Sequence, residues 1–426
     1  MSTHRDVIII GGGVAGINTS MIIREYDKES SISVFTKAPF TYTKMALHYI
    51  IKRGLSIEFF KLYPDFDTKK IEFYPSTEVK ALNLVERSIK FESQGIEKKY
   101  TFNKLVLATG AKPIKPGIDG VNKIGVFTFN EYDEALMANN YICVGMKAFV
   151  VGAGLVGLLL ADALRTRGLD VTLVEKLPGI GLTMFDEEIS NYLIQRLVSK
   201  GVKVLTNASI DKIMGDRKDK RRVKKVVING YKFPADMVFF TIGVKPENRL
   251  AVSAGIELGS KKAIRTNEKF ETSVPNVYSV GDCATSIDYF TKKETFRPIG
   301  TLAVSMAEIA GKNCAGVETT YDGFIPMQYL EVFDIAIIRI GLNTKEAKEL
   351  GLNTSKSIIK YKVPGIGKHP ISLLVCLRDR RQTIIGWQAA SPWLVSYKST
   401  IFMKAIKEKI GLDEFMDKEK NIELVG

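Results

Sequence analysis

The stretch VIIIGGGVAG, residues 7–16, decides the fold, because it joins a run of β-branched residues directly to a glycine-rich turn. A short apolar run bounded by such a turn is typical of a buried strand in a parallel sheet. A helix-compatible stretch follows to residue 26, and residues 32–35 form the next apolar run. This order of strand, glycine turn, helix and strand predicts a unit that binds a dinucleotide, with the pyrophosphate on the N-terminus of the helix.

The same order returns in the middle of the chain as AFVVGAGLVG, residues 148–157, followed by a helical pattern to residue 167 and a strand over 171–174. In a G-x-G-x-x-G turn the first glycine allows the tight bend, the second admits the pyrophosphate, and the third lets helix and strand pack closely. A glycine-rich turn without a ligand is the alternative for one isolated match. Two copies in the same strand-to-helix context favour two dinucleotide sites.

The residue that ends the second strand of each unit is expected to contact a ribose. In the second unit it is Glu175, whose carboxylate can accept hydrogen bonds from both ribose hydroxyls and would repel the additional phosphate of NADPH. This favours NADH, although the neighbouring Lys176 leaves NADPH open. In the first unit the position is Thr36, whose hydroxyl can still bond a ribose.

Length and composition limit the class of protein. The chain has 426 residues, enough for two to four domains, and its 45% hydrophobic and 25% charged residues are typical of a globular protein. The net charge of +14 raises nucleic acid, an acidic membrane surface or an acidic protein as a partner. The basic stretch 212–225 contains interspersed acids and no aromatic residue, which favours a solvated hairpin over a nucleic-acid site. The longest uninterrupted apolar run, residues 148–161, is too short to span a bilayer.

The cysteines and histidines argue against metal and local disulfide chemistry. Cys143, Cys283, Cys314 and Cys376 are far apart in the sequence, and only three histidines occur. No CxxC pair is present to form a local redox disulfide or half of a zinc site. We therefore expect a reduced, cytoplasmic protein without a metal centre.

The last quarter of the chain has a different pattern. After residue 326 it changes to alternating strands, as at residues 335–340 and 371–377, and ends in an amphipathic helix over 394–410. This predicts a separate α+β domain. Docking of the lysine-bearing helix on its own sheet or at a dimer interface is favoured over a membrane surface.

Five motifs occur in a fixed order: the first glycine turn, LATGAKP at 107–113, the second glycine turn, TIGVKP at 241–246 and SVGDCA at 279–284. In these motifs the chain resembles the pyridine nucleotide-disulfide oxidoreductases, flavoproteins with two dinucleotide-binding domains, over nearly its whole length. PIGTLA at 298–303, VFD at 332–334 and GL at 341–342 resemble the branch of NADH oxidases, coenzyme A-disulfide reductases and rubredoxin reductases.

Together, the two repeats and the resemblance predict an α/β fold with two Rossmann-like three-layer dinucleotide-binding domains and a C-terminal α+β domain. The FAD-binding domain is expected to be discontinuous, formed by residues 1–112 and 245–325. The NAD(P)H-binding domain is expected at residues 113–244, and the interface domain at 326–426.

The resemblance implies FAD, and NADH or NADPH, as cofactors. In the family, Asp282 would bond the ribityl chain of the flavin, Thr301 would open a helix pointing at the flavin ring, and Val79 would hold the adenine through its backbone. The residues assigned to FAD are Gly11, Gly13, Ala15, Gly16, Thr36, Lys37, Val79, Thr109, Gly110, Asp282 and Thr301. Those assigned to NAD(P)H are Gly152, Gly154, Leu155, Val156, Gly157, Glu175 and Gly243.

Two positions depart from the family. The oxidases and disulfide reductases carry a redox cysteine after the first unit, and the best match here is Met45, whose thioether cannot act as a thiolate. Residues 42–50 instead resemble rubredoxin reductases, in which electrons leave the flavin without passing through a cysteine. Where much of the family has a glutamate near the nicotinamide, this chain has Leu159, which predicts weaker nicotinamide orientation or an unusual pose.

Lys44 and His48 are the expected catalytic side chains. The Lys44 ammonium could stabilise a reduced, anionic flavin, and a solvated loop lysine is the alternative. His48 is either a proton donor near the flavin or a neutral packing residue, with packing preferred.

We expect an enzyme that passes a hydride from NAD(P)H to flavin and electrons on to a small acidic protein of the rubredoxin or ferredoxin type. Oxygen reduction, as in NADH oxidases, is one alternative, and a flavin- and NADH-binding sensor or interaction protein with low turnover is another. A nucleic-acid or membrane partner is not expected. A homodimer through the C-terminal domain is a further expectation.

Overall fold

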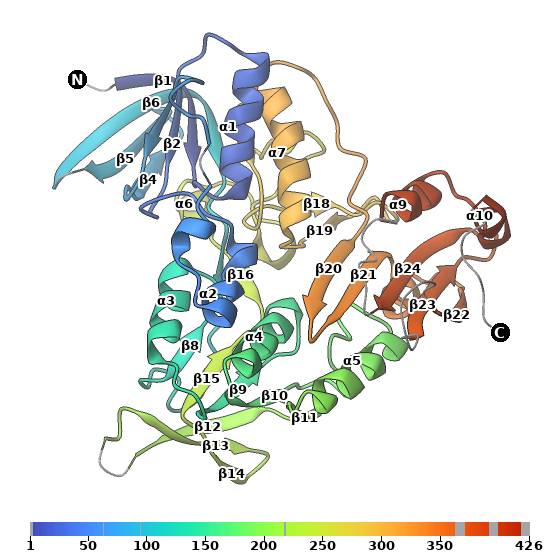
Figure 1. Ribbon diagram of the computed structural model, residues 1–426. Helices are drawn as coiled ribbons and strands as arrows, with labels where there is room; N and C mark the ends of the chain where they lie inside the picture. Colours follow the sequence, from blue (N-terminus) through green and yellow to red (C-terminus); the bar gives the residue numbers. More distant parts are fainter. Residues whose placement is uncertain are drawn as a thin grey trace. The chain divides into compact units, whose positions relative to one another are not determined.

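The computed structural model describes residues 3–62, 64–93, 95–216, 219–362, 371–391 and 399–418. The chain divides into two compact units. Unit 1 comprises Met1–Leu47, Ser56–Pro113 and Val244–Phe324, and unit 2 comprises His48–Leu55, Ile114–Gly243 and Ile325–Gly426. Figure 1 labels the elements of both units.

Unit 1 is built on a sheet in the order β3-β2-β1-β6-β5-β4, with β17 also pairing with β6. The strands are β1 (Thr3–Ile10), β2 (Ile32–Phe35), β3 (Ile71–Tyr74), β4 (Val79–Asn83), β5 (Ser88–Ser93), β6 (Ile96–Leu107) and β17 (Val277–Ser279). Strands β1, β2, β3, β6 and β17 are parallel where they pair, whereas β4, β5 and the first half of β6 are antiparallel. The sequence predicted only the last four residues of β6, 104–107, because most of the strand before them is polar and not buried.

The alternation of β1 places apolar side chains on both faces of this sheet. Val7 and Ile9 join a core formed with helices α1 (Val14–Tyr26) and α7 (Gly300–Cys314), which lie side by side in Figure 1. Ile8 and Ile10 join a second core with β4, β5 and α6 (Arg249–Ser253). A strand buried on both faces reads as a continuous apolar run, as in residues 7–10.

Smaller elements complete unit 1. They are the 3₁₀ turns η1 (Lys44–Ala46), η2 (Ile57–Phe59) and η3 (Ser260–Lys262), the paired strands β7 (Ala111–Pro113) and β16 (Val244–Pro246), and the paired strands β18 (Ser286–Ile287) and β19 (Glu294–Thr295).

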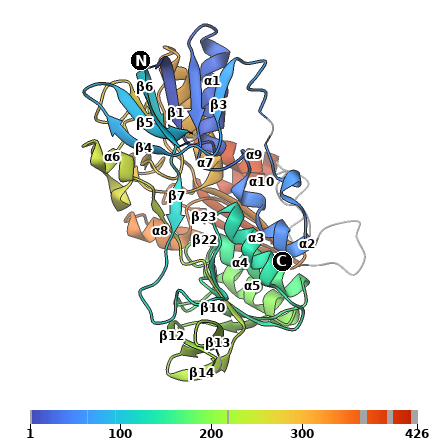
Figure 2. The ribbon, with the colours of Figure 1, turned by 90° about the vertical axis from the view of Figure 1, so that its left-hand side faces the viewer.

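Unit 2 contains a parallel sheet in the order β11-β10-β9-β15-β8. Its strands are β8 (Val126–Thr128), β9 (Lys147–Val151), β10 (Asp170–Val174), β11 (Lys203–Leu205) and β15 (Met237–Phe240). Its helices are α2 (His48–Arg53), α3 (Tyr132–Tyr141), α4 (Leu155–Thr166) and α5 (Glu187–Ser199), of which α2 lies against α3 and α4 (Figure 2). A separate antiparallel sheet comprises β12 (Ile210–Gly215), β13 (Val223–Ile228) and β14 (Tyr231–Pro234).

The C-terminal part of unit 2 is an antiparallel sheet in the order β20-β21-β24-β23-β22. Its strands are β20 (Met327–Val332), β21 (Ile335–Gly341), β22 (Ser355–Lys362), β23 (Ile371–Arg378) and β24 (Ile384–Ser391). Its helices are α8 (Thr344–Glu349), α9 (Ser399–Lys407) and α10 (Leu412–Lys418). Below, this sheet is called the C-terminal sheet.

The predicted α/β fold class is confirmed, and the expected strands over 32–35 and 237–240 coincide with β2 and β15. The single helix predicted over residues 394–410 runs too far, and the described residues contain a further helix, α10, after it. Within the described residues α9 ends at Lys407, because Lys409 adopts a left-handed conformation with φ of 56° and Ile410 pairs with Ile384. Residues 394–398 lie outside the described residues. The division into three domains at residues 112, 245 and 326 stays a prediction.

Candidate dinucleotide sites

The first glycine turn is tightly packed at Gly11, Gly12 and Gly16 and open at Gly13. A Cβ on Gly11 would collide with the Ala108 carbonyl oxygen, and a Cβ on Gly16 would collide with the carbonyl oxygen of Gly11. At Gly13 an added Cβ would meet nothing within 4 Å, and the backbone there is extended, with φ of −83°. Gly13 therefore leaves a space beside the N-terminus of α1 that a pyrophosphate would fit.

The ends of the parallel strands meet at this turn. The Gly11 N–H donates to the Phe35 carbonyl at 2.8 Å, and a Cβ on Gly12 would lie 2.7 Å from Cβ of the buried Thr36. A Cβ on Gly281 would lie 2.8 Å from Cβ of Ala15. The structure thus brings the glycine turn, Thr36 and the residues that follow β17 together at one edge of the sheet.

Asp282 and Lys44 lie within electrostatic reach of each other. Burial raises the pKa of Asp282 above its ordinary value, and the positive charge of Lys44 lowers it in part. A carboxyl group that is partly removed from water is suited to bonding the hydroxyls of a bound cofactor. Lys44 itself begins η1 and is exposed, and it belongs to unit 1 together with Asp282.

Met45 lies at the N-terminus of α7. Its Sδ atom is 2.9 Å from the position that a Cβ on Gly300 would occupy, and its side chain is 62% exposed. Thr301 is exposed in the first turn of the same helix. Met45, the residue expected in place of a redox cysteine, therefore puts a thioether at the positive end of a helix dipole.

Lys37 and Val79 are linked through Glu78. The Lys37 ammonium lies 2.7 Å from Glu78 Oε1, and Val79 next in sequence is buried at the start of β4. Thr109 donates its hydroxyl to the Glu247 carbonyl at 2.5 Å, and the Glu247 N–H donates to the Gly110 carbonyl at 2.9 Å. Sequence reasoning did not single out Glu78 or Glu247, because isolated acids carry no spacing signal.

We expect Glu78 to make unit 1 sensitive to acid. Bonds from Lys37 and then Lys80 and Arg249 hold the pKa of Glu78 at about 2, against an ordinary value of 4.5. The carboxylate therefore stabilises the fold above about pH 4.5, and this contribution is lost as the pH falls from about 4.5 to about 2. The fall in the urea midpoint between about pH 5 and about pH 3 should be smaller in Glu78→Gln than in the wild type. Equal falls in the two proteins would contradict this assignment.

The second glycine turn repeats the geometry of the first. A Cβ on Gly157 would collide with the carbonyl oxygen of Gly152, whereas a Cβ on Gly154 would meet nothing within 4 Å. Gly154 is also extended, with φ of −77°, and precedes Leu155 and the exposed Val156 in the first turn of α4. The Thr241 hydroxyl donates to the Gly152 carbonyl at 2.9 Å, a role that its place in the TIGVKP motif could have suggested.

The Glu175 carboxylate is hydrogen-bonded to the second glycine turn. Its Oε2 accepts from the Ala153 N–H at 2.7 Å, and its Oε1 accepts from the Leu177 N–H at 2.9 Å. Gly243, with φ of 110°, follows β15 on the same edge of the sheet, and Leu159 is half-buried on α4. The residues expected at the NAD(P)H site are thus gathered within unit 2.

His48 belongs to unit 2, where it begins α2, and the side chain is buried with its ring 4.1 Å from that of Tyr49. Cys283 is also buried, and its Sγ atom lies 3.4 Å from the Leu107 carbonyl oxygen and 3.3 Å from that of Val280. Its surroundings match the expected small packing residue. The catalytic roles of Lys44 and His48 stay predictions.

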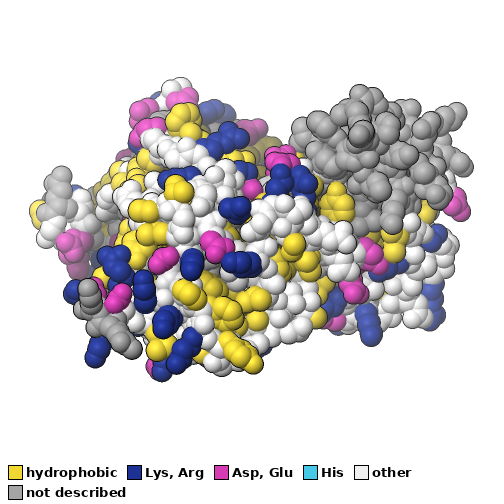
Figure 3. All heavy atoms as spheres, turned by 60° about the horizontal axis from the view of Figure 1, so that its bottom comes forward, with side chains coloured by type: hydrophobic (Ala, Val, Ile, Leu, Met, Phe, Trp, Pro, Cys, Tyr) yellow, Lys and Arg dark blue, Asp and Glu magenta, His cyan; other side chains and the backbone are white. Residues whose placement is uncertain are grey.

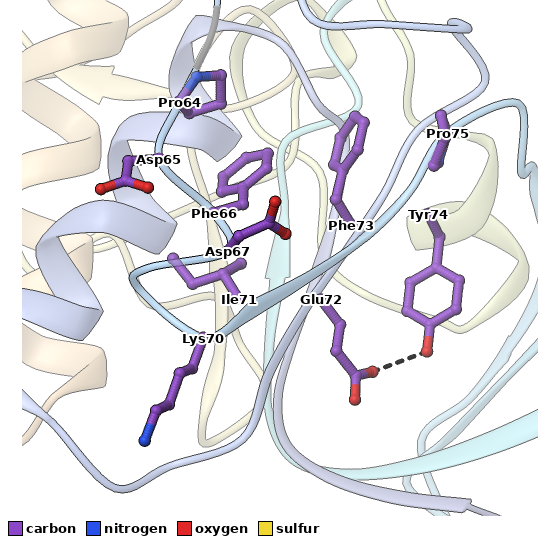
Figure 4. Close-up of a pocket in the computed structure, with 10 residues that line it drawn as sticks. All are labelled: Pro64, Asp65, Phe66, Asp67, Lys70, Ile71, Glu72, Phe73, Tyr74 and Pro75. Carbon is purple, nitrogen blue, oxygen red and sulfur yellow. Dashed lines mark hydrogen bonds between the residues drawn. The ribbon is translucent and has the colours of Figure 1, made fainter.

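A further concavity of about 830 Å³ lies along β3, the edge strand of unit 1 (Figure 4). One continuous segment, residues 64–75, lines it. The Glu72 carboxylate accepts from the Tyr74 hydroxyl at 2.7 Å and pairs with Arg5 at 2.6 Å. Because its lining residues are outside both glycine turns, we assign it no part in cofactor binding.

The basic stretch 212–225 forms the predicted hairpin of β12 and β13 within its described residues. Arg221 pairs with Asp219 at 3.1 Å, and Arg222 donates to the Tyr141 hydroxyl at 2.9 Å. On the face drawn in Figure 3, Lys and Arg side chains alternate with acidic and apolar ones. No helix of the described residues is both long and apolar enough to cross a bilayer.

A family model described as "Pyridine nucleotide-disulphide oxidoreductase" matches residues 5–306. The chain is 32% identical to an NADH oxidase of Methanocaldococcus jannaschii over 97% of this chain and 93% of that protein. It is 30% identical to an NAD(P)H coenzyme A polysulfide/persulfide reductase of Pyrococcus horikoshii, over 84% of this chain and 80% of that protein. Among solved structures, an NAD-dependent persulfide reductase of A. fulgidus matches with a TM-score of 0.89 and 28% identity, over 99% of this chain and 79% of that one.

Proposed function

Because the chain belongs to the pyridine nucleotide-disulphide oxidoreductase family, we propose that it oxidises NADH through FAD and passes electrons directly to an external acceptor, without a redox cysteine. The chain is an NAD(P)H-dependent flavoprotein oxidoreductase. The observation that carries the direct route is Met45, which lies against Gly300 at the start of α7.

The two open glycines fit the two cofactors. The space at Gly13 and the half-buried Asp282 would hold FAD, and the space at Gly154 together with Glu175 would hold NAD(P)H. When bound, FAD supplies the chemistry of accepting a hydride from the nicotinamide and releasing electrons to an acceptor. The Lys44 charge and the N-terminus of α7 would stabilise negative charge near Asp282 and Met45.

The proposal disfavours thiol chemistry at the flavin. Cys283 and Cys376 are buried among neighbouring groups, and burial raises the pKa of Cys376 to about 12. Cys143 is exposed but lies in unit 2, between α3 and β9. Reduction of a disulfide or persulfide through a flavin-side thiolate would need a cysteine where this chain has Met45.

Glu175 sets the expected preference for NADH. A carboxylate beside the ribose repels the 2′-phosphate of NADPH. We expect Glu175→Gln, which keeps an acceptor for the Ala153 N–H but removes the charge, to raise kcat/KM for NADPH relative to NADH by roughly tenfold. Lys176→Gln is the opposite control and should lower the same ratio. Steady-state kinetics with both nucleotides checks this, and an unchanged ratio in Glu175→Gln would contradict the assignment.

We propose a small acidic electron-transfer protein as the acceptor, because the net charge of +14 favours association with an acidic surface. Oxygen is the second candidate, supported by the relative named NADH oxidase. A reduced flavin can pass electrons to either acceptor without a thiol, so Met45 does not separate them.

Reoxidation of the NADH-reduced enzyme ranks the two acceptors. Enzyme reduced without oxygen is mixed either with oxidised rubredoxin or with oxygen-saturated buffer, at low and high salt. If the acceptor is an acidic protein, reoxidation by rubredoxin is the faster reaction and slows as salt rises. Faster reoxidation by oxygen with no dependence on salt would replace the protein acceptor with oxygen.

A further inference from the structure

We propose that the C-terminal sheet positions the NAD(P)H-binding turn, and that Arg339 and Gln388 are the positioning residues. This inference rests on the proposed assignment of the second glycine turn to NAD(P)H. The connection between sheet and turn is a continuous series of hydrogen bonds within unit 2.

Arg339 and Gln388 form a buried polar pair on adjacent strands of the C-terminal sheet. They face each other as register partners on β21 and β24, and each side chain is only 1% exposed. Burying a guanidinium and an amide is costly unless both are fully bonded. The hydrogen-bond partners of these two side chains therefore identify the segment that the pair stabilises.

Both side chains bond the backbone of one loop, residues 177–186, which follows β10. Arg339 Nη1 donates to the Met184 carbonyl at 2.8 Å, and Gln388 Oε1 accepts from the Asp186 N–H at 2.7 Å. The Asp186 carboxylate in turn accepts from the Thr344 N–H at 2.8 Å and from the Thr344 hydroxyl at 2.7 Å. Three residues of the C-terminal part thus fix the end of this loop.

The other part of the loop is bonded to the glycine turn. The Met184 N–H donates to the Gly181 carbonyl at 2.8 Å, and the Gly181 N–H donates to the Ala153 carbonyl at 3.0 Å. The Ala153 N–H donates to Glu175. Ala153 lies between the first two glycines of the turn. The orientation of its peptide groups therefore determines the position of Gly154 and of the open space beside it.

The loop between these bonds has little freedom to absorb a change. Ile180, Met184 and Phe185 are all buried. A shift of the Asp186 N–H, left without a partner, is therefore expected to move Gly181 and Ala153 as well. A misplacement of about 1 Å at a binding group is enough to cost up to a hundredfold in function.

The test compares Gln388→Leu with Gln388→Glu in the full-length holoenzyme. Leucine removes the acceptor for the Asp186 N–H, whereas glutamate keeps one. The matched control is Gln328→Leu, since Gln328 faces Arg339 from β20 but its Oε1 has no hydrogen-bond partner among the described residues. Anaerobic reduction by NADH at increasing concentration gives the dissociation constant and the limiting reduction rate separately.

We expect Gln388→Leu to raise the dissociation constant for NADH by about tenfold, with the limiting rate and the FAD content near those of the wild type. Gln388→Glu and Gln328→Leu should retain wild-type affinity. If Gln388→Leu does not fold, Thr344→Val replaces it, because it removes only one bond to Asp186.

Wild-type affinity for NADH in Gln388→Leu, or in Thr344→Val where it replaces that variant, would overturn the positioning role. Equal weakening of NADH binding in Gln328→Leu would also overturn it. Gly154→Val is included as a separate arm. If that variant binds NADH normally, the assignment of the turn itself fails, whatever Gln388 does.

Discussion

Valine at Gly154 is expected to abolish reduction of the enzyme by NADH while FAD stays bound. The backbone at Gly154 is extended, and an added Cβ meets no protein atom within 4 Å, so a Cβ can be attached there without straining the chain. It fills only the space assigned to the pyrophosphate. We expect the affinity for NADH to fall by roughly a hundredfold or more, measured as the dissociation constant in anaerobic flavin reduction.

Two other glycines control this experiment. Gly117 in unit 2 likewise has open space around an added Cβ and lies outside both turns, so Gly117→Val should behave like the wild type. Gly13→Val fills the corresponding space of the first turn and should lose FAD, visible as a colourless protein that remains folded. If NADH reduces the flavin of Gly154→Val as well as that of Gly117→Val, the second turn is not the NAD(P)H site.

The second large effect is expected from Met45→Cys. A cysteine at this position would lie at the N-terminus of α7, where the helix dipole lowers a thiol pKa and favours the thiolate. We expect a new long-wavelength absorption band that arises from charge transfer between the thiolate and the oxidised flavin. We also expect alkylation to inactivate Met45→Cys but not the wild type.

The exposed Cys143 must be removed from both proteins, so Cys143→Ser serves as the common background. Met45→Ser in that background controls for loss of the thioether. If Met45→Cys shows no new band and no sensitivity to alkylation, residue 45 does not face the flavin, and the direct route loses its main support.

Much of the fold follows from the sequence because its strands are buried on both faces. Residues 7–10 and 237–240 are continuous apolar runs followed by glycine motifs, and such runs have few alternatives to a parallel strand. The end of the helix predicted over residues 394–410 was harder to place. It depends on a left-handed residue, Lys409, and a bond between Ile410 and Ile384, neither of which has a local signal.

The glycine turns were predicted for the same physical reason that they form. An added Cβ would collide with a neighbouring atom at Gly11, Gly16, Gly152 and Gly157. A glycine in the sequence at these positions therefore already indicates close packing. The supporting contacts were not predictable in this way. Gln388 and Asp186 are 202 residues apart, and sequence spacing carries no information about such a bond.

The stoichiometry of anaerobic reduction tests the central claim most directly. A flavin accepts two electrons, and a redox-active cysteine pair would accept two more. Purified enzyme is titrated with NADH in the absence of oxygen while the flavin absorbance is followed. We predict that one equivalent of NADH per FAD bleaches the flavin completely and that a second equivalent is not consumed. Consumption of two equivalents, or a flavin that NADH does not bleach, would contradict an enzyme that transfers electrons without a cysteine.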